Sequence, residues 1–492
     1  MRHFDRRGFL KASASASSLL ALAALDNPMQ AEEKKKVEPA KSGDVNSQLR
    51  VAVVGVHGRG MSHVGAFAGN TNLNTVVTHI CDADSGVIGR AMKAVEDKQK
   101  KPAMFVQDIR KLLEDKSIDI ISIATPNHWH ALAAIWAMQA GKDVYVEKPV
   151  SHNVHEGRVT VEVARKLGKI CQAGTQSRST KGMRDSIAFV HSGKIGKVTV
   201  SRGLCYKPRK SIGKVSGPQK PPATMDYDLW CGPAPLKMPH RNTGFGTVHY
   251  DWHWIWDYGN GDLGNQGIHE MDKARWGLNK NSLPNSVISL GGRFGYVDDG
   301  ETANTQICVF DYGDSELIFE VRGLPTEKYK GAGVGNIFHG TEGYVVCPSY
   351  SSGVAYDKDG NILAKFGGGG DEGHFGNFIK AVRARDYTIL TGDIQEGHLS
   401  SALCHLGNIS YRLGDLTTFS KSALSDDKDA ADAFQRMTQH LSDNKVPLDK
   451  TEYRMGRKLI IDPKTESFRG DKEANAMLFR EYRKGFEVPE KV

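Results

Sequence analysis

The sequence predicts an α/β protein with two domains, the first on a parallel sheet and the second on a mostly antiparallel sheet. Between residues 48 and 170, apolar runs alternate with helix-compatible segments, which is the pattern of βαβ units. From residue 197 onward, strand-like runs follow one another, and two pairs are joined by hairpin turns. The roughly 445 residues after Ser47 exceed what one hydrophobic core usually serves, which also indicates two domains.

The N-terminal segment has the layout of a bacterial export signal. The stretch "DRRGFLK" contains two adjacent arginines and precedes the soft apolar run "ASASASSLLALAAL". This order is typical of a twin-arginine signal, which we expect to span residues 1–31 and to engage the twin-arginine translocase. Residues 32–47 are charged and poor in apolar groups, and they predict a disordered linker. We therefore expect a protein that folds in the cytoplasm and is exported to the periplasm or beyond the membrane.

Composition excludes several other classes of protein. The formal charge is +8 over 492 residues, with lysine and arginine scattered among acidic residues, so we expect no nucleic-acid partner. After the signal, no run reaches the ~18 apolar residues of a membrane helix, so the mature form should have no membrane span. The seven cysteines are isolated and form no CxxC pair, which predicts buried thiols.

The first predicted strand leads into a glycine-rich turn. In "VAVVGVHGRG", a buried strand is followed by Gly55, Gly58 and Gly60. Such a turn lets the backbone approach a pyrophosphate, whose charge lies at the N-terminus of the next helix. The strict GxGxxG spacing is absent, because His57 takes the place of the middle glycine and Gly58 and Arg59 follow it. By itself the turn is a weak signal for dinucleotide binding.

The second predicted strand strengthens that signal. The run "TVVTHICDAD" contains Asp82, 22 residues beyond Gly60, where an acidic residue binds the ribose hydroxyls of a dinucleotide. A carboxylate there repels a 2′-phosphate, so we expect NAD, with NADP less favoured. The alternative is a loop aspartate that caps the next helix.

Further strands are predicted in "IDIISIAT" and "DVYVEKP", with helices in "DIRKLLEDK" and "HALAAIWAMQAG". Ligands of such a sheet bind at the carboxyl ends of its strands, where "TPNHWH" and "EKP" lie.

The segments "ATPNHWH" (124–130) and "VYVEKPVS" (144–151) resemble the Gfo/Idh/MocA oxidoreductase family, named for glucose-fructose oxidoreductase and inositol dehydrogenase. The resemblance continues through "CQAGTQSR" and "GNGDLGNQGIHEMD" and covers roughly Leu49 to Gly414. It implies a Rossmann NAD(P)-binding domain over 48–170 and an α/β domain on an open, largely antiparallel sheet over 171–414. A helix of the second domain would return to the first, and residues 415–492 would form a C-terminal extension. The family also implies a homo-oligomer.

The resemblance assigns the cofactor site and a catalytic lysine. The cofactor-binding residues that it and the glycine turn indicate are Gly55, His57, Gly58, Arg59, Gly60, Asp82, Thr125, Pro126, Asn127, His130, Glu147 and Lys148. In the family, the lysine of EKP lies beside the nicotinamide and hydrogen-bonds the reacting hydroxyl, and this position is Lys148. Glu147 would orient it. Without the flanking motif, Glu147 and Lys148 would be interpreted as a surface ion pair.

The second domain supplies the other half of the expected site. His269 matches the family's active-site histidine, and Asp272 lies three residues later, on the same face of a helix. The dehydrogenases usually carry an aspartate at the position of Asn265, and an amide cannot accept a proton. Asp272 or Asp262 could compensate, or either could cap a helix. We take Lys148, His269 and Asp272 as the catalytic candidates.

Substrate-binding residues are expected in the same segments. They are Lys148, Gln176, Arg178, Trp254, Asn265 and His269. Trp252, Trp254 and Trp256 alternate, so on a strand they would share a face and could stack on a sugar ring, although large aromatic side chains most often fill a core. The histidines nearby lack a carboxylate or thiol to complete a ligand set, so we expect no metal.

The rest of the chain predicts sheet and helix. Strands are expected in "KVTVSRGLCY", "NSVISLGGRFGYV", "NTQICVFDYGDSELIFEVRG" and "GYVVCPSYSSGVAYDKDGNILAKF", with hairpin turns at "YGDS" and "DKDGN". Helices are expected in "HFGNFIKAVRARD" and "GHLSSALCHLGNISYRLG". The tail after residue 416 is polar, but its spaced apolar residues indicate an ordered wrap.

Export restricts the chemistry, because no sizeable NAD pool lies outside the cytoplasmic membrane. A cofactor loaded before export must stay bound, and each turnover must restore its redox state. We therefore expect an NAD(P)-dependent oxidoreductase that acts on a sugar, polyol or glycoside with tightly bound cofactor. One alternative is an NAD-dependent glycoside hydrolase that uses transient oxidation and elimination. A second alternative is a sugar-binding protein without catalytic activity.

Overall fold

The structure is a computed structural model, and it describes residues 47–238, 246–419 and 423–492. The expected export signal (1–31) and all but the last residue of the linker lie outside these residues. Within the described residues, none of the helices is long and apolar enough to cross a membrane.

The first sheet is parallel and belongs to a βαβ series. Its strands are β1 (Leu49–Val54), β2 (Thr75–Cys81), β3 (Met104–Val106), β4 (Ile120–Ile123), β5 (Asp143–Val146) and β6 (Cys171–Ala173). Consecutive strands are connected by α1 (Gly60–Phe67), α2 (Gly89–Gln99), α3 (Ile109–Glu114), α4 (Asn127–Gln139) and α5 (Val154–Lys166). The strand order is β3-β2-β1-β4-β5-β6, which reverses direction between β1 and β4. Ligands of such sheets bind at the carboxyl ends of the strands near this reversal.

The turn after β1 requires its glycines for geometric reasons. Gly55 has a φ of 83°, and a Cβ there would lie 2.6 Å from the carbonyl oxygen of Ala124 at the end of β4. A Cβ on Gly60, the first residue of α1, would lie 1.8 Å from the carbonyl oxygen of Gly55. A side chain at either position would therefore force the turn apart.

The second sheet is mostly antiparallel. Its strands are β7 (Val198–Tyr206), β8 (Ser286–Gly292), β9 (Thr305–Asp311), β10 (Glu316–Arg322), β11 (Val334–Gly340), β12 (Gly343–Cys347), β13 (Gly353–Asp357), β14 (Ile362–Phe366), β15 (Asp415–Thr418), β16 (Glu452–Met455), β17 (Leu459–Asp462) and β18 (Ser467–Phe468). The main path is β14-β13-β12-β11-β7-β10-β9-β8-β16-β15, in which only the central pair β7 and β10 is parallel among the described strands. The parallel first sheet and this sheet confirm the predicted fold class, including the hairpins β9–β10 and β13–β14.

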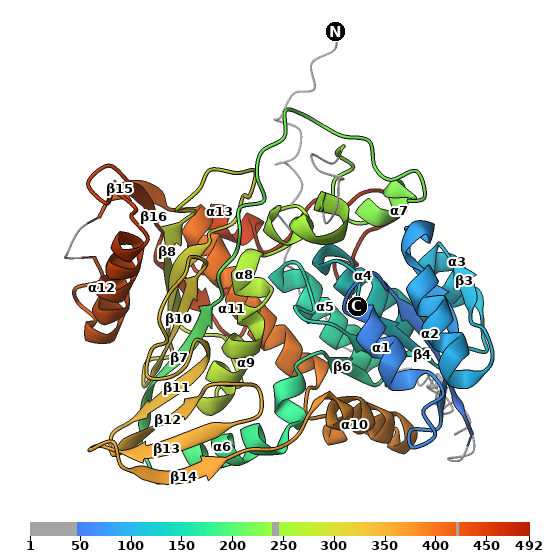
Figure 1. Cartoon of the computed structure of the whole chain (residues 1–492), viewed down its shortest axis with the longest axis horizontal. Helices are drawn as coiled ribbons and strands as arrows, with labels where there is room; N and C mark the ends of the chain where they lie inside the picture. The colour runs from blue at the N-terminus through green and yellow to red at the C-terminus, as the bar shows by residue number, and fades with distance from the viewer. Residues whose placement is uncertain (1–46, 239–245, 420–422) are drawn as a thin grey trace, which may run out of the picture. The chain divides into compact units, whose positions relative to one another are not determined.

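Helices cover both faces of the second sheet (Figure 1). They are α6 (Lys181–His191), α8 (Gly261–Gly264), α9 (Gly267–Gly277), α11 (Ile394–Arg412), α12 (Lys428–Asp443) and α13 (Lys472–Ala476). Two further helices, α7 (Tyr227–Cys231) and α10 (Asp371–Ala384), contribute to the core of the first domain. Along β10, Leu317 and Phe319 share a core with residues of α9 and α11, whereas Ile318 packs with residues of α12. Because neighbouring residues of a strand point to opposite faces, α12 covers the face away from α9 and α11. Helix α11 also packs against α5 and so returns to the first domain.

The C-terminal extension is ordered where the structure describes it. Strands β15, β16 and β17 lengthen the second sheet next to β8. Near the end of the chain, Phe486 and Val488 are buried in the core of the first domain, with α3 and α4. The prediction of an ordered wrap is therefore confirmed.

The seven cysteines are all free and buried, as predicted.

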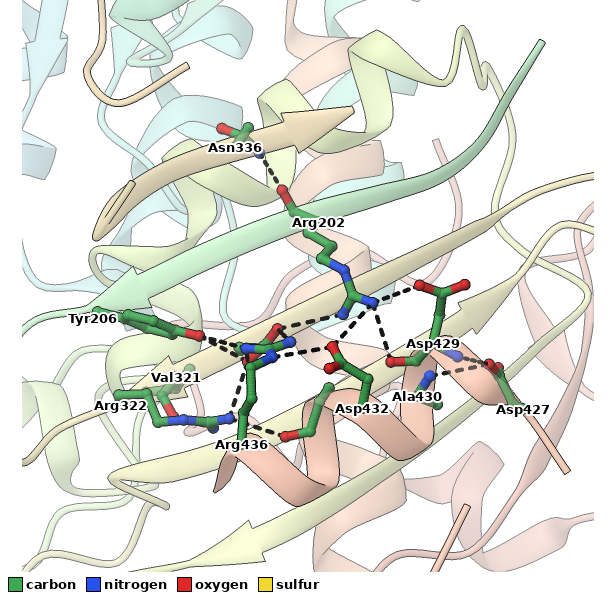
Figure 2. Close-up of polar contacts among 12 residues, drawn as sticks. Arg202, Tyr206, Val321, Arg322, Asn336, Asp427, Asp429, Ala430, Asp432 and Arg436 are labelled. Atoms are coloured by element: carbon green, nitrogen blue, oxygen red, sulfur yellow. Dashed lines mark hydrogen bonds and ion pairs between the residues drawn. The ribbon is translucent and has the colours of Figure 1, made fainter. Parts of the chain in front are cut away.

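A buried cluster of charges holds α12 on the sheet (Figure 2). Glu320, on β10, has no exposed surface, and its carboxylate accepts hydrogen bonds from Arg436 at 2.6 Å, Arg322 at 2.9 Å and Tyr206 at 2.8 Å. Arg202 lies 3.5 Å from the same carboxylate. Three arginines thus converge on one carboxylate, and Arg436 comes from α12. Burial alone would raise the pKa of Glu320, but the charges of Arg322 and Arg436 bring it below its ordinary value.

Candidate active site

A cavity of about 470 Å³ lies at the carboxyl ends of the strands of the first sheet, and residues of both domains line it. It brings together most of the residues predicted from the sequence. These are Gly55, His57, Gly58, Arg59, Asp82, Thr125, Pro126, Asn127, His130, Glu147, Lys148, Gln176, Asn265 and His269. Gly60 is not among the lining residues, because it packs under Gly55 and shapes the turn.

One end of the cavity has the groups that a dinucleotide needs. A Cβ on Gly58 would meet no atom within 4 Å, so the turn leaves open space beside the first helix turn. Asp82 follows β2 and accepts hydrogen bonds from the backbone N–H groups of Val56 (2.8 Å) and Asp84 (3.0 Å). The hydroxyl of Thr125 is buried and makes no hydrogen bond to any group in the described part of the chain. The open turn, the carboxylate and this hydroxyl fit a bound NAD.

Asp82 offers a direct test of nucleotide choice. Desolvation raises its pKa to about 6, so the carboxylate forms above that pH and is lost below it. We expect NAD to bind more weakly as the pH falls through 6. Asp82→Asn should weaken NAD binding about 10- to 100-fold at pH 8, since one charge-assisted hydrogen bond contributes roughly 1.5–3 kcal/mol. Calorimetric titration of nucleotide-free protein measures both effects.

A matched control is Asp97→Asn, which changes an exposed carboxylate on α2 and should leave nucleotide binding unchanged. NADP should bind relatively better to Asp82→Asn, because the negative charge that repels the 2′-phosphate is gone. Equal NAD affinity for wild type and Asp82→Asn at pH 8 would contradict the assignment of Asp82.

Glu147 is the centre of a hydrogen-bond network beneath the cavity. Its carboxylate accepts from Arg59 Nε at 2.9 Å and Gln176 Nε2 at 3.2 Å, and it lies 3.2 Å from His63 Nε2. Burial alone would raise the pKa of Glu147, but the hydrogen bond from His63 and the charge of Arg59 lower it well below its ordinary value. Glu147 is therefore ionised and fixed, and it holds the backbone at Lys148. Sequence analysis missed His63, which no motif marks.

Lys148 and His269, one from each domain, line the same cavity. Lys148 Nζ donates a hydrogen bond to the backbone oxygen of Asn265 at 3.0 Å, so Asn265 contacts the lysine through its main chain. Desolvation lowers the pKa of the Lys148 ammonium. Burial and then the charge of Lys148 lower the pKa of His269 well below its ordinary value. His269 is therefore neutral near pH 7, and its Nδ1 has no hydrogen-bond partner among the described residues.

Tyr350 also lines the cavity, and sequence analysis missed it. Its ring lies 4.8 Å from the ring of His269, and its hydroxyl accepts a hydrogen bond from Gln266 Nε2 at 2.6 Å. Burial raises its pKa, so the hydroxyl stays protonated at neutral pH. Tyr350 therefore adds a hydroxyl beside His269.

Two predicted site residues pair with each other away from the cavity. Asp272 accepts hydrogen bonds from Arg178 Nε at 2.8 Å and from the Ser400 hydroxyl at 2.7 Å, and neither Asp272 nor Arg178 lines the cavity. One turn along α9 from His269, Asp272 faces α11. The structure therefore does not bring Asp272 and Arg178 into the cavity lining, and the catalytic role of Asp272 and the substrate-binding role of Arg178 stay predictions. Asp262, the other candidate to compensate for Asn265, is held by Arg209 at 2.7 Å.

The tryptophan prediction was wrong in its geometry. Residues Asp251–Trp254 form a 3₁₀ helix instead of a strand, so the three rings do not share a face. Trp254 is buried outside the cavity lining, and Trp252 lines the cavity in its place. Trp256 lines a different cavity.

A long segment between β7 and α8 covers the nucleotide end of the cavity, and we call residues 207–238 and 246–260 the cover. Figure 1 shows it running from β7 to α7, beside the first domain. Asp84 and Met225 form a bridge between the loop after β2 and the cover. His249 Nε2 lies 3.2 Å from the Asp84 carboxylate, and its ring stacks on His57 at 4.5 Å. Sequence analysis missed these contacts, because only the fold brings the cover to the glycine turn.

A parallel-sheet domain with an NAD-type turn, joined at the cavity to an antiparallel-sheet domain, is an architecture found in dinucleotide-dependent oxidoreductases. Family models match both parts: residues 49–175 match "Oxidoreductase family, NAD-binding Rossmann fold" and residues 182–441 match "Oxidoreductase family, C-terminal alpha/beta domain". The chain belongs to the Gfo/Idh/MocA oxidoreductase family. The predicted family, enzyme class and NAD cofactor are thereby confirmed.

Curated relatives carry a hydrolase name. The chain is 32% identical over 212 residues to a glycosyl hydrolase family 109 protein of Saccharopolyspora erythraea, which covers 41% of this chain and 45% of the relative. It is 36% identical over 180 residues to glycosyl hydrolase family 109 protein 2 of Shewanella sp. (strain ANA-3). This match covers 35% of this chain and 39% of the relative. The match thus spans less than half the length of these relatives.

Solved structures share the fold. Levoglucosan dehydrogenase in complex with NADH and levoglucosan superposes with a TM-score of 0.56 and 17% identity, covering 73% of this chain and 97% of that one. The WlbA dehydrogenase of Bordetella pertussis in complex with NADH and UDP-GlcNAcA superposes with a TM-score of 0.53 and 18% identity. This match covers 73% of this chain and 96% of that one. Within the described residues, no group of three or more His, Cys, Asp or Glu side chains is placed to hold a metal ion.

Proposed function

We propose that the protein is an exported NAD-dependent oxidoreductase that acts on a hydroxyl of a sugar, polyol or glycoside and keeps its cofactor bound. The observation that carries this proposal is that Lys148 and His269 line the cavity that contains the glycine turn. When bound, NAD supplies a hydride acceptor for the carbon that bears the reacting hydroxyl. The protein's own residues position that hydroxyl and move its proton.

Lys148 is the group suited to take the hydroxyl proton. Its lowered pKa increases the share of neutral amine, which is the form that accepts a proton. Its hydrogen bond to the backbone of Asn265 and its neighbour Glu147 fix its position. The Asn265 side chain cannot accept a proton. The second proton acceptor is therefore neutral His269, whose Nδ1 has no hydrogen-bond partner among the described groups.

The cover supports retention of the cofactor. Its contacts to His57 in the glycine turn and to Asp84, two residues after Asp82, lie at the nucleotide end of the cavity, so a nucleotide bound there would have to displace them to leave. Retention suits export, because a nucleotide lost outside the cytoplasm cannot be replaced. Support for export itself comes from the "DRRGFLK" segment.

Glycoside hydrolysis is the second candidate, and the names of the curated relatives favour it. Oxidation of a ring carbon makes the neighbouring C–H acidic. His269 would take that proton, the glycosidic bond would break with its electron pair going to the departing oxygen, and water would add to the resulting double bond. The electrons return to the ring carbon at the end, so the net reaction is hydrolysis and needs no outside oxidant.

One experiment separates these candidates. The mature protein is purified without added nucleotide, denatured, and its supernatant examined by absorbance and mass spectrometry for NAD. The folded protein is then incubated with p-nitrophenyl glycosides and with free sugars. We expect bound NAD together with sugar oxidation, limited to one equivalent per protein unless a second carbonyl substrate takes the hydride back. Release of p-nitrophenol without net oxidation assigns the hydrolase instead. If NAD neither co-purifies nor binds when added, both proposals fail and the sugar-binding alternative remains.

A further inference from the structure

A second cavity, of about 260 Å³, lies between α11, the residues just before α5 and the C-terminal extension. It shares no lining residue with the nucleotide cavity among the residues described. Residues 476–481, at the end of α13 and just after it, form one wall. The site therefore exists only because the extension folds back onto the two domains.

Two buried N–H groups of this cavity lack a well-placed protein acceptor. His152 is 7% exposed, and Arg480 Nη1 approaches its Nδ1 at 3.4 Å. Because arginine can only donate, His152 Nδ1 is the acceptor and the ring hydrogen of neutral His152 lies on Nε2. His152 Nε2 and Arg480 Nε are both buried, and neither has an acceptor in good hydrogen-bond geometry in the ranges that the structure describes, although the backbone of Trp256 lies close enough to the His152 ring to affect its pKa. Buried donors of this kind usually have a partner, which indicates a ligand with acceptor oxygens.

The other walls are aromatic and acidic. Trp256 and Phe479 are lining residues, and Phe479 is 51% exposed. Arg412 lies over the Trp256 ring at 4.2 Å, and the His155 ring lies 4.5 Å from that of Phe479. Asp257 and Glu481 are also lining residues, and the Asp257 carboxylate forms an ion pair with Lys237 at 2.7 Å. The cavity thus offers donors, acceptors and apolar ring faces together.

We propose that this cavity binds a single uncharged sugar ring. Hydroxyl groups can accept from the two buried N–H groups and donate to the two carboxylates, while the C–H faces of the ring lie on Trp256 or Phe479. Charge alone does not select a simple anion, because Asp257 and Glu481 offset the positive charge of Arg480 and of Arg412, which lies over the Trp256 ring. An apolar ligand would leave the N–H groups unpaired. The volume is below the roughly 300–1,000 Å³ of drug-sized ligand pockets, which limits the ligand to one ring. The site is independent of the proposed oxidoreductase activity.

The test uses the mature protein saturated with NAD. D-glucose, D-galactose and N-acetyl-D-glucosamine are titrated separately by calorimetry, with saturation-transfer NMR to detect weak binding. We expect at least one of them to bind, and Phe479→Ala and Arg480→Met to weaken this binding at least tenfold. Arg469→Met, which changes an exposed arginine of the same extension, should leave it unchanged.

The outcomes separate this site from the nucleotide cavity. Binding that His269→Ala abolishes and the two cavity variants retain belongs to the nucleotide cavity and overturns the proposal. Binding of acetate or citrate in place of all three sugars overturns the ligand class, and no binding of any probe overturns the site. If Arg480→Met loses its folded circular dichroism spectrum, Phe479→Ala decides, because that side chain is half exposed and its loss leaves the core intact.

Discussion

Lys148→Ala is expected to lower kcat/KM by roughly 10²- to 10⁴-fold while NAD remains bound, the range that removal of a general base usually costs. The reason is local: Lys148 is the group at the centre of the cavity whose amine is fixed by Asn265 and whose pKa desolvation lowers. Lys148→Met should behave in the same way, because it keeps the apolar stem and removes only the amine. Steady-state kinetics on the preferred sugar or aryl glycoside, with NAD content measured in parallel, tests the expectation.

The wild-type pH profile adds a second readout for Lys148. Only the neutral amine accepts a proton, so oxidation should rise with pH through the lowered pKa of Lys148 and reach its plateau earlier than an ordinary lysine would allow. His269 is already neutral above its own lowered pKa, so it should add no inflection between pH 6 and 8. Lys93→Ala, an exposed lysine on α2, is the control for loss of one charge. Full activity in Lys148→Ala would remove this residue from the mechanism.

Sequence analysis found the site features that depend on residues close together in the chain, and it missed those that depend on contacts between distant segments. The glycine turn, Asp82 and the EKP segment were predictable, because each depends on one strand end and its next few residues. The position of Asp272 outside the cavity lining was not predictable, because its spacing from His269 shows only that the two residues share a helix face. Packing of α9 against α11 decides which residue of that face reaches the cavity. The cover was missed for a related reason: Met225 and His249 reach Asp84 from more than 140 residues away in the chain.

The fold was predicted where the pattern of side chains is regular. The hairpin β9–β10 alternates clearly, and the turn "YGDS" marks its bend. Strand β11, "VGNIFHG", went unrecognised because two glycines and an asparagine interrupt its apolar residues. Asn336 in this strand donates a hydrogen bond to the backbone oxygen of Glu270 in α9 at 2.7 Å, so a polar residue there serves packing of α9 on the sheet.

The charge cluster under α12 leads to the second large expected effect. Glu320→Gln should lower the free energy of unfolding by about 3–5 kcal/mol, because it leaves two buried arginines, Arg202 and Arg322, and the partly buried Arg436 without their shared carboxylate. The amide has nearly the same shape, so the loss reports the charge and its hydrogen bonds and not a new cavity. Asp429 and Asp432 still pair with Arg202, which keeps part of the cluster neutralised.

Urea unfolding followed by tryptophan fluorescence measures this effect, with Glu342→Gln as the matched control. Glu342 pairs with Lys358 on the surface, where both side chains are 60% exposed, so its loss should change stability by less than about 0.5 kcal/mol. The pKa of Glu320 is lowered in the folded protein, so its stabilisation is present above the unfolded pKa of about 4.3 and is lost as the pH falls through the folded value. The difference between wild type and Glu320→Gln should therefore shrink in acid. Equal effects of the two substitutions at pH 7 would show that the arginines do not depend on Glu320.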